Sequence, residues 1–370
     1  MSQAFYRKYR PQKFSEFIGQ EHIAKTLANA VSLGMISHAY LFYGPRGSGK
    51  TTLARILAKA INCQKRKEGE SEPCNECESC REIMEGRSLD LVEIDAASHR
   101  GIDEVRELRD NIKFLPAKSK YKVFIIDEAH QLTKEAANAL LKTLEEPPAH
   151  AVFILATTEV HKMIPTILSR CQRFDFRKLT QKEILKKLEF IAKNEKIKIE
   201  KEALQLIAQK AEGSLRDAES LLDQVFTLFG EKEVKLQDLK QLLGLVEIEI
   251  VFEILELIFQ KKAKEAIEYL NSIYEKGTDL QELVREILNL LRDILLVKTG
   301  NKNLLFERRG EDEVKRIEKL AQILPEANLE KIINLFLEAQ NKMKFSPILQ
   351  LPLELAIVEV VEWLSGRVAE

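Results

Sequence analysis

The run GPRGSGKT is the part of this sequence with the clearest capacity for chemistry. It fits the pattern G-x-x-x-x-G-K-[ST], which forms a loop whose backbone N–H groups wrap around phosphates. An apolar strand pattern precedes it and a helical pattern follows it, so a helix N-terminus would add a dipole that favours anions. Lys50 would reach the β- and γ-phosphates, and the Thr51 hydroxyl would bind Mg²⁺. The loop residues and the threonine after them are Gly44, Pro45, Arg46, Gly47, Ser48, Gly49, Lys50, Thr51 and Thr52.

The run KVFIIDEAH adds two carboxylates to this chemistry. Its apolar residues predict a buried strand ending at Asp127, which could hold the Mg²⁺ shell, while Glu128 could polarise an attacking water. By itself an Asp-Glu pair is more often an ordinary polar strand end. Together with Lys50 and Thr51 it indicates hydrolysis of ATP or GTP, and ATP is favoured because no Asn/Thr-Lys-x-Asp run is present to read guanine. His130 completes the string D-E-A-H, which also occurs in helicases, but no other helicase signature is evident, so we expect a solvent-facing or hydrogen-bonded polar residue.

Three further segments could act on a nucleotide. The run AVFILATTE ends with Thr157 and Thr158, and a hydroxyl there could sense the γ-phosphate or orient water, although plain strand-end hydroxyls have the same spacing. In SRCQRF, Arg170 precedes the last predicted strand and could project into a neighbour's ATP site as an arginine finger. In GSLRDAES, Arg216 begins a helical pattern and could contact the nucleotide from above. Because a lone arginine is usually a solvated surface residue, spacing alone supports neither arginine.

Four of the five cysteines lie in one short, charged insert. Cys63, Cys74, Cys77 and Cys80 fit C-x10-C-x2-C-x2-C, in which two C-x2-C steps bring thiolates close together. We predict a closed, structural Zn²⁺ site with four thiolate ligands. Free or redox-active thiols are the alternative, but a redox motif would need one C-x2-C near a thioredoxin-like unit. Cys171 stands apart and is expected to be a small packed residue.

Hydrophobic periodicity predicts the elements that must position these side chains. Short apolar runs in the first half predict the strands HAYLFYG, LDLVEID, KVFIIDEAH, AVFILATTE and QRFDF. Helical patterns lie between them, namely TLARILAKAIN, EVRELRDNIKFL and KEAANALLKTLEE, and the last one is stopped by Pro147 and Pro148. This alternation predicts an α/β fold with a parallel sheet covered by helices on both faces.

From about Leu179 the strand patterns disappear. The runs QKEILKKLEFIAKNE, KEALQLIAQKA and SLRDAESLLDQVFTLF predict three amphipathic helices. Longer helical patterns follow from about Leu242, such as LQELVREILNLLRDILLVK and LEKIINLFLEAQNKM. We therefore expect an α/β domain over residues 1–178 with the cysteine insert at 63–80, a helical lid over 179–241 and an all-helical domain over 242–370.

Composition narrows the class of protein. The chain has 370 residues, 45% of them hydrophobic, which is enough for about two or three domains with sizeable cores. Although 31% of the residues are charged, the formal net charge is -1, so bulk charge predicts no nucleic-acid or membrane partner and leaves only a local basic surface open. The first residues contain no signal-peptide core, and no run of about eighteen apolar residues could span a membrane. We expect a cytoplasmic chain, in which clustered cysteines more often bind metal than form disulfides.

Taken together, these motifs resemble the bacterial clamp-loader ATPases, the gamma/tau subunits of DNA polymerase III within the AAA+ superfamily. The resemblance covers nearly the whole chain. It rests on YRKYRPQKFSEFIGQEHI, HAYLFYGPRGSGKTTLARILAKAINC, the four cysteines, FIIDEAHQLTKEAANALLKTLEEPP, ILATTE and SRCQRF. It implies that Arg10 and Pro11 border the adenine pocket and that Thr158, rather than Thr157, lies at sensor 1.

The same resemblance assigns the two arginines. It implies that Arg170, within the segment Ser169-Arg170-Cys171, is the arginine finger acting in a neighbouring subunit, and that Arg216 lies at sensor 2. The implied cofactors are ATP, Mg²⁺ and a structural Zn²⁺. Arg7, Lys8 and Arg100 are candidate DNA contacts, although solvated surface charge is the commoner role for such residues.

The family's fold and activity follow as expectations from this resemblance. An ATPase domain and a three-helix lid would be followed by a helical collar that joins subunits into a ring. ATP-bound loaders of this kind grip and open the sliding clamp, bind primer-template DNA and release the clamp on DNA after hydrolysis, as part of the DNA polymerase III holoenzyme. The implied partners are the delta and delta-prime subunits, further gamma/tau copies, the sliding clamp and primer-template DNA, with no membrane.

Two rival functions remain at this stage. A non-catalytic scaffold subunit is one, but such relatives typically lack the intact set of Lys50, Thr51, Asp127 and Glu128. A branch-migration helicase is the other, and it leaves the cysteine insert and the long helical C-terminal half without a role. Because the sequence ends at Glu370, shortly after the expected collar, it resembles a short gamma-like form or a shortened piece of the longer tau form.

Overall fold

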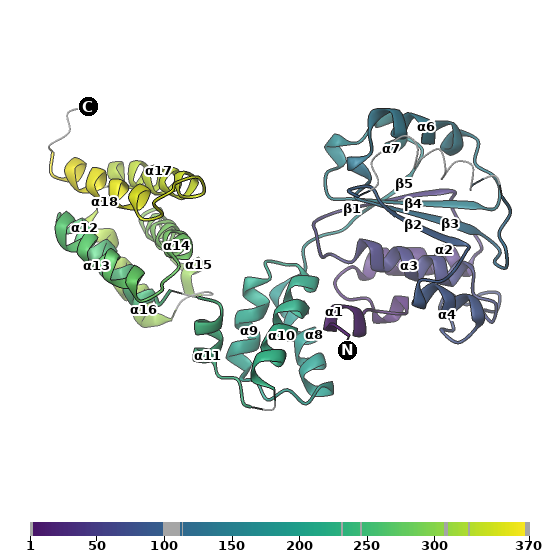
Figure 1. The fold of residues 1–370 in the computed structure, drawn as a ribbon, viewed down its shortest axis with the longest axis horizontal. Helices are drawn as coiled ribbons and strands as arrows, with labels where there is room; N and C mark the ends of the chain where they lie inside the picture. The colour runs from purple at the N-terminus through teal and green to yellow at the C-terminus, as the bar shows by residue number, and fades with distance from the viewer. Residues whose placement is uncertain are drawn as a thin grey trace. The chain divides into compact units, whose positions relative to one another are not determined.

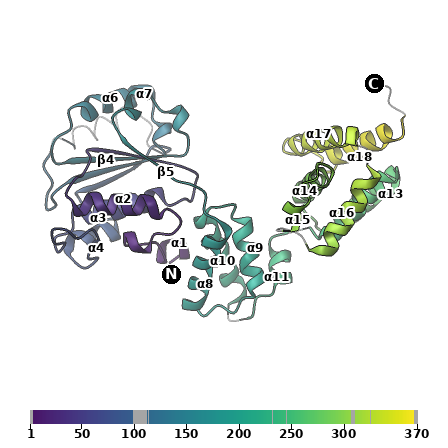
Figure 2. The same cartoon turned by 180° about the vertical axis from the view of Figure 1, so that it is seen from behind.

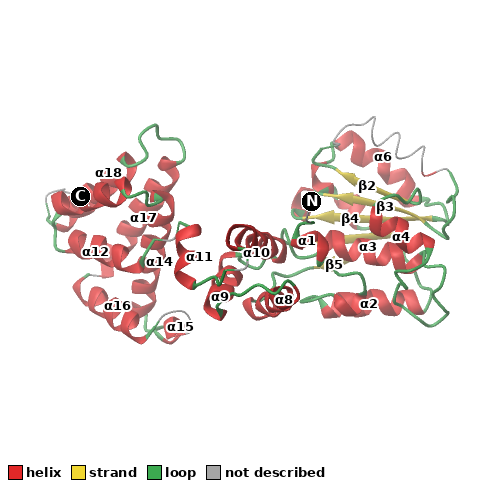
Figure 3. Cartoon of the chain, turned by 60° about the horizontal axis from the view of Figure 1, so that its bottom comes forward, coloured by secondary structure: helices red, strands yellow, loops and turns green. Residues whose placement is uncertain are grey.

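The computed structural model describes residues 3–98, 112, 114–230, 232–244, 246–306, 310–324 and 326–366. The chain divides between Leu236 and Gln237 into two compact units, which are described separately below. Figure 3 shows that the strands belong to the first unit, whereas the described part of the second consists of helices and loops. The predicted helix EVRELRDNIKFL lies almost wholly outside the described residues.

A five-stranded parallel sheet in the order β2-β3-β4-β1-β5 forms the centre of the first unit. The strands are β1 (Ala39–Tyr43), β2 (Leu91–Asp95), β3 (Lys122–Asp127), β4 (Ala151–Thr157) and β5 (Gln172–Asp175). All five predicted strands and the parallel sheet are therefore confirmed. Because parallel strands end at the same edge and β4 lies between β1 and β3, the side chains that follow these three strands are brought together.

Helices cover both faces of this sheet, as predicted (Figure 1). Tyr40 and Phe42 of β1 face one core with Leu57, whereas the intervening Leu41 faces a second core with Leu140. This alternation is the two-residue period of a strand that is buried on both faces. The helices of this part of the unit are α1 (Phe5–Lys8), α2 (Glu21–Ser32), α3 (Lys50–Ile61), α4 (Glu78–Glu85), α6 (Lys134–Glu145) and α7 (Pro165–Leu168).

Three helices complete the first unit, namely α8 (Gln181–Asn194), α9 (Lys201–Lys210) and α10 (Leu215–Phe229). Each one matches a predicted amphipathic run. Thr180 and Glu183 form a capping box at the start of α8, and the Ser214 side chain accepts from the Asp217 N–H at the start of α10. The N-terminal α1 lies beside these helices, as Figure 2 shows, and the rings of Phe5 and Phe226 are 5.6 Å apart between centroids.

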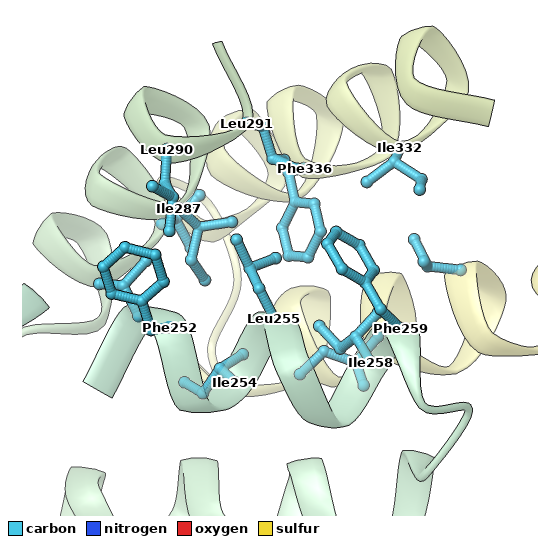
Figure 4. Close-up of a cluster of buried hydrophobic side chains, with 14 of the residues drawn as sticks. Phe252, Ile254, Leu255, Ile258, Phe259, Ile287, Leu290, Leu291, Ile332 and Phe336 are labelled. Carbon is cyan, nitrogen blue, oxygen red and sulfur yellow. The ribbon is translucent and has the colours of Figure 1, made fainter. Parts of the chain in front are cut away.

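The second unit has a hydrophobic core of its own (Figure 4). Its helices are α11 (Leu236–Leu242), which begins at the boundary, α12 (Ile248–Phe259), α13 (Ala263–Glu275), α14 (Leu280–Lys298), α15 (Asn303–Phe306), α16 (Glu311–Ile323), α17 (Glu326–Met343) and α18 (Leu351–Leu364). Asp279 caps α14, which packs against α12, α16 and α17. Trp363 packs against this core, and the Lys331 ammonium lies 4.7 Å from the centroid of its ring. Within the described residues of the chain, no helix is both long and apolar enough to cross a membrane.

Candidate functional site

The glycine-rich loop connects β1 to α3, so it stands at the edge where the strands end. Gly47 and Gly49 have φ angles of +73° and +97°, in the left-handed region that favours glycine, and Gly49 is the N-cap of α3. The Lys50 side chain is buried, and its ammonium donates to the carbonyl oxygens of Gly44 at 2.7 Å and Pro45 at 2.9 Å. Burial lowers the pKa of Lys50, and two nearby carboxylates oppose this shift.

The first of these carboxylates meets the phosphate loop directly. Thr51 Oγ1 donates to Asp127 Oδ2 at 2.7 Å, although the two residues are far apart in the sequence. The other oxygen, Asp127 Oδ1, accepts from the Glu128 N–H at 3.0 Å, which fixes the plane of the carboxylate. Hydroxyl and carboxylate oxygens are the ligands that Mg²⁺ prefers in proteins, so this pair fits a magnesium site beside the loop.

The second carboxylate, that of Glu128, is held by the end of β4. Thr158 Oγ1 donates to Glu128 Oε2 at 3.0 Å. Behind this pair, His130 Nδ1 lies 3.0 Å from Thr157 Oγ1 and 3.4 Å from Glu128 Oε2, and its side chain is only 4% exposed. Of the two threonines, Thr158 thus contacts Glu128 and Thr157 contacts His130. His130 is a hydrogen-bonded polar residue and does not face solvent.

A cleft of about 1020 Å³ opens beside the loop. Residues 46–52, Asp127 and Glu128 line it, whereas Gly44 and Pro45 lie outside its lining. Among the other parts of the first unit that line the cleft, two carry predicted residues. The N-terminal segment supplies Gln3, Tyr6, Arg7, Arg10, Pro11, Gln12, Phe17 and Ile18, and the region of α8 to α10 supplies Leu179, Lys187, Leu215, Arg216 and Glu219.

The predicted arginines at the cleft belong to these two parts. Arg10 Nε donates to Thr52 Oγ1 at 3.0 Å, and burial, with a neighbouring arginine, lowers the pKa of Arg10 to about 10. The Arg216 guanidinium lies 5.0 Å from the centroid of the Tyr6 ring. The cleft therefore brings together the loop, the two carboxylates and the residues predicted to border the base.

The N-terminus of α10 approaches the phosphate loop very closely. A Cβ atom placed on Gly47 would lie 2.0 Å from Ser214 Oγ, the hydroxyl that caps α10. No side chain larger than hydrogen fits at that position without a shift of one element. The three-helix region and the phosphate loop are thus in direct contact.

Arg170, in contrast, lies outside the cleft of its own chain. It follows α7, and its guanidinium donates to Glu145 Oε1 and to the Thr166 carbonyl oxygen, each at 2.7 Å. Glu145 ends α6, so the ion pair ties α6 to α7. Cys171 packs against the adjacent core, and burial raises the pKa of its thiol to about 11, as expected of a small packed residue.

Three buried charged residues that line the cleft, Lys59, Lys187 and Glu219, were not predicted from the sequence. Glu219 Oε1 has no hydrogen-bond partner, and burial raises the pKa of this carboxyl to about 8. A signal does exist in the sequence, because each charge interrupts the apolar face of a helix. Glu219, for example, lies one turn from both Leu215 and Leu222.

The four clustered cysteines meet as predicted. The sulfur atoms of Cys63, Cys74, Cys77 and Cys80 all lie within 4.8 Å of one another. Four thiolates around Zn²⁺ at about 2.3 Å require sulfur–sulfur distances of about 3.8 Å, and Cys74 and Cys80 are 4.0 Å apart. Burial raises the pKa of the Cys74 thiol, but N–H groups of Glu76 and Cys77 outweigh this and bring it to about 6. The cluster is compatible with a zinc site.

The fold and the cleft together define a class of protein. A phosphate loop follows a central strand of a parallel sheet, an acidic strand end lies beside it, and the N-terminus of α10, one of three successive helices, contacts the loop. This is the AAA+ arrangement of a P-loop domain followed by a helical lid, and a further all-helical unit follows it.

Comparisons with known proteins identify the family within this class. Three family models match successive parts of the chain. They are described as "DNA polymerase III, delta subunit" over residues 19–180, "DNA polymerase III clamp loader subunit, ATPase lid domain" over 183–230, and "DNA polymerase III subunits gamma and tau domain III" over 234–366.

Curated relatives agree with these matches. The chain is 38% identical to the DNA polymerase III subunit gamma of Buchnera aphidicola subsp. Acyrthosiphon pisum, with 97% of this chain and 98% of that protein covered. It is 43% identical to the subunit tau of Bacillus subtilis, with 97% of this chain and 63% of that protein covered. It is 39% identical to the subunit tau of Escherichia coli, with 97% of this chain and 55% of that protein covered. The chain belongs to the DNA polymerase III gamma/tau family. It spans less than two-thirds of the length of these two tau relatives.

Solved structures resemble the chain more distantly. The Thermotoga maritima RuvB Holliday junction branch migration motor has a TM-score of 0.48 at 23% identity, with 68% of this chain and 79% of that chain covered. A Bacillus subtilis DNA clamp loader delta protein has a TM-score of 0.39 at 19% identity, with 91% and 99% covered. These likenesses are too distant to bear on function.

Proposed function

We propose that this chain is the ATP-hydrolysing subunit of a bacterial replicative clamp loader, which loads the sliding clamp onto primer-template DNA. The observation that carries the proposal is the 2.7 Å hydrogen bond between Thr51 and Asp127 beside the buried Lys50, in a chain of the gamma/tau family. A non-catalytic scaffold subunit would have no need to bring a hydroxyl, a carboxylate and an ammonium together at a phosphate loop.

The proposed hydrolysis uses this chain's own groups in distinct roles. The N–H groups of the loop and Lys50 bind the β- and γ-phosphates, and Thr51 and Asp127 hold Mg²⁺. When bound, Mg²⁺ neutralises part of the phosphate charge. Glu128 orients the attacking water. Thr158, which donates to Glu128 Oε2, holds that carboxylate in place.

The two arginines and the N-terminal residues complete the proposed site. Arg10 and Pro11 would border the base, and Arg216 would contact the phosphates from the lid side, since all three line the cleft. Arg170 would act on the ATP of a neighbouring subunit. Its position outside its own cleft supports this role, and its ion pair with Glu145 is half-exposed and could exchange for a phosphate.

The remaining parts of the proposal concern architecture and partners. Cys63, Cys74, Cys77 and Cys80 would bind a structural Zn²⁺. The proposed domains are residues 1–178, 179–241 and 242–370, and the last is the collar that would join delta, delta-prime and further gamma/tau copies. The clamp and primer-template DNA are the other proposed partners.

Of the three candidate DNA contacts, Arg7, Lys8 and Arg100, the structure describes the first two. Arg7 lines the nucleotide cleft, and Lys8 pairs with Glu195 at 2.5 Å. Arg100 lies outside the described residues. Bulk charge is close to neutral, so DNA contact would need a local basic surface.

The experiment that tests this function measures ATP hydrolysis while the other loader subunits, the clamp and primed DNA are added in turn. We expect weak activity alone, strong stimulation by clamp plus primed DNA, and loss of hydrolysis in Lys50→Ala. Arg170→Ala should lose the stimulation but still bind ATP. Absence of stimulation by any component would overturn the clamp-loader proposal, and persistent hydrolysis in Lys50→Ala would overturn the site.

Two control variants isolate the role of Arg170. Glu145→Gln breaks the same ion pair but keeps the arginine, so it should retain stimulation if Arg170 acts in a neighbour. Arg173→Ala removes a nearby exposed arginine that pairs with Asp175 at 2.7 Å, and it should also retain stimulation. Equal loss in Arg170→Ala and Glu145→Gln would instead show that the ion pair within the chain is what matters.

A further inference from the structure

Lys59 joins the cysteine cluster to the wall of the nucleotide cleft. It lies on α3 and is 1% exposed, yet each of the three N–H donors of its ammonium has an acceptor. Two acceptors belong to Gln12, the carbonyl oxygen at 2.9 Å and Oε1 at 2.6 Å. The third is Asn75 Oδ1 at 2.8 Å, and Asn75 directly follows the cysteine at position 74. One buried ammonium thus connects two segments that are far apart in the sequence.

A second set of hydrogen bonds also joins the insert to the N-terminal segment. The Glu72 carboxylate accepts from the N–H groups of Phe14 at 2.9 Å and Ser15 at 2.8 Å. These N–H groups open the short 3₁₀ helix Phe14–Glu16, so the carboxylate satisfies donors that the helix leaves free. Glu72 comes from the same insert as Asn75. The insert therefore holds the N-terminal segment at two separate points.

The segment that is held in this way forms part of the cleft. We call residues 10–18 the N-terminal strap, and five of them line the cleft, namely Arg10, Pro11, Gln12, Phe17 and Ile18. Phe14 and Phe17 anchor the strap in the core under α2 and α3. Part of its backbone bonds outside the strap, because the Gln12 carbonyl oxygen accepts from Lys59 and the N–H groups of Phe14 and Ser15 donate to Glu72. The insert supplies Glu72 directly and supplies Asn75, an acceptor of Lys59, which has a φ of +61° in the left-handed region.

We propose that the four-cysteine insert is a positioning device for the nucleotide cleft, in which Lys59 and Glu72 hold the N-terminal strap against a bound nucleoside triphosphate. This inference rests on the proposed function, because it assumes that ATP occupies the cleft. Lys59 and Glu72 are positioning residues and do not touch the reacting atoms. Their loss therefore weakens nucleotide binding and leaves the chemical step at Asp127 and Glu128 intact.

The test compares nucleotide affinity with turnover in two variants. Lys59→Met keeps the stem of the side chain and removes three hydrogen bonds, and Glu72→Gln removes the charge that accepts from the strap. We expect each variant to bind ATP about tenfold more weakly in titration calorimetry, with kcat changed less than about twofold. Lys65→Met is the matched control, because Lys65 lies in the same insert and its ammonium pairs with the exposed Glu76, away from the strap, so ATP affinity should not change.

A second readout follows the strap itself. Amide hydrogen exchange at Phe14 and Ser15 should become faster in Glu72→Gln, because their N–H groups lose a charged acceptor. Removal of Zn²⁺ by a zinc-selective chelator, with Mg²⁺ kept in excess, should lower ATP affinity in the wild type but produce little further loss in Lys59→Met. Additive losses would contradict the proposed connection through Asn75.

The outcomes separate this inference from the proposed function. If the wild type binds no ATP, the proposed function itself fails. If the wild type binds ATP and Glu72→Gln and Lys59→Met bind it equally well with normal circular dichroism, the positioning role is wrong. Should Lys59→Met fail to fold, Glu72→Gln decides the question, because its carboxylate is only half-buried and its removal leaves the core intact.

Discussion

Glu219 is the residue whose environment in the cleft is least favourable to its charge. It is 5% exposed, its Oε1 atom lacks a hydrogen-bond partner, and burial raises its pKa to about 8. The nearby Lys187 opposes this shift, but the pKa of Lys187 is itself lowered by burial, and its ammonium donates to the Tyr9 carbonyl oxygen at 2.9 Å. At neutral pH the folded protein therefore keeps Glu219 protonated.

This protonation makes stability depend on pH. The unfolded chain releases the proton near the ordinary glutamate pKa of about 4.3, so the free energy of unfolding falls as pH rises from about 4 to about 8. Glu219→Gln removes this cost while it keeps the shape of the side chain. We expect the variant to be more stable than the wild type by about 4 kcal/mol at pH 7.5 and by about 1 kcal/mol at pH 5.

Denaturant unfolding at the two pH values measures this difference. Glu189→Gln on the same helical layer is the control, because Glu189 is exposed on α8 and its removal should change stability little at either pH. A stability gain for Glu219→Gln that is the same at pH 5 and pH 7.5 would show that ionisation is not its cause.

At the scale of elements, the close contact between the phosphate loop and α10 leaves no room for a side chain at position 47. Gly47→Ala would place a methyl group 2.0 Å from Ser214 Oγ at a φ of +73°, so it adds a clash to the conformational cost. We expect ATP affinity to fall at least about tenfold and α10 to lose its cap. Titration calorimetry and the free energy of unfolding measure the two effects.

Gly34→Ala provides the matched control for this substitution. Gly34 has nearly the same φ, +70°, but no atom lies within 4 Å of an added Cβ. It should therefore cost only the conformational penalty of about 1 kcal/mol, with unchanged ATP affinity. Equal effects of the two substitutions would mean that the lid does not press on the loop.

The elements of the fold could be predicted from the sequence more fully than the contacts between them. The strands were predictable because β3 and β4 are continuous apolar runs bounded by polar residues, and the phosphate loop has a fixed spacing. The contacts of Thr158 with Glu128 and of Lys59 with Gln12 were not, because they join residues distant in sequence and depend on packing. Hydrophobic periodicity predicts which face of a helix or strand a residue lies on, but it does not predict which side chain that residue contacts.

At the scale of the whole molecule, the chain contains separate hydrophobic cores. The sheet has one on each face, and the helical unit has its own, in which α14 contacts α12, α15, α16 and α17. A unit with its own core can fold as a unit of its own. The boundary between Leu236 and Gln237 is therefore where the chain can be divided with least loss of packing.

We expect the fragments 1–236 and 237–370 each to unfold in one cooperative thermal transition, and fragment 1–236 to bind ATP as tightly as the whole chain, within about threefold. Fragment 1–200 is the control, because it separates α8 from α9 and α10 and exposes their shared apolar faces. Circular dichroism and calorimetry check the outcome. A fragment 237–370 without a cooperative transition would show that its core depends on the first unit.

Trp363 makes it possible to follow the unfolding of one unit separately in the intact chain. It is the single tryptophan among the 370 residues, and it packs against the core of the helical unit beside Lys331. Tryptophan fluorescence therefore reports the state of the helical unit alone, whereas far-ultraviolet circular dichroism averages over both units. The difference between the two signals shows which unit a given variant has disturbed, without any added label.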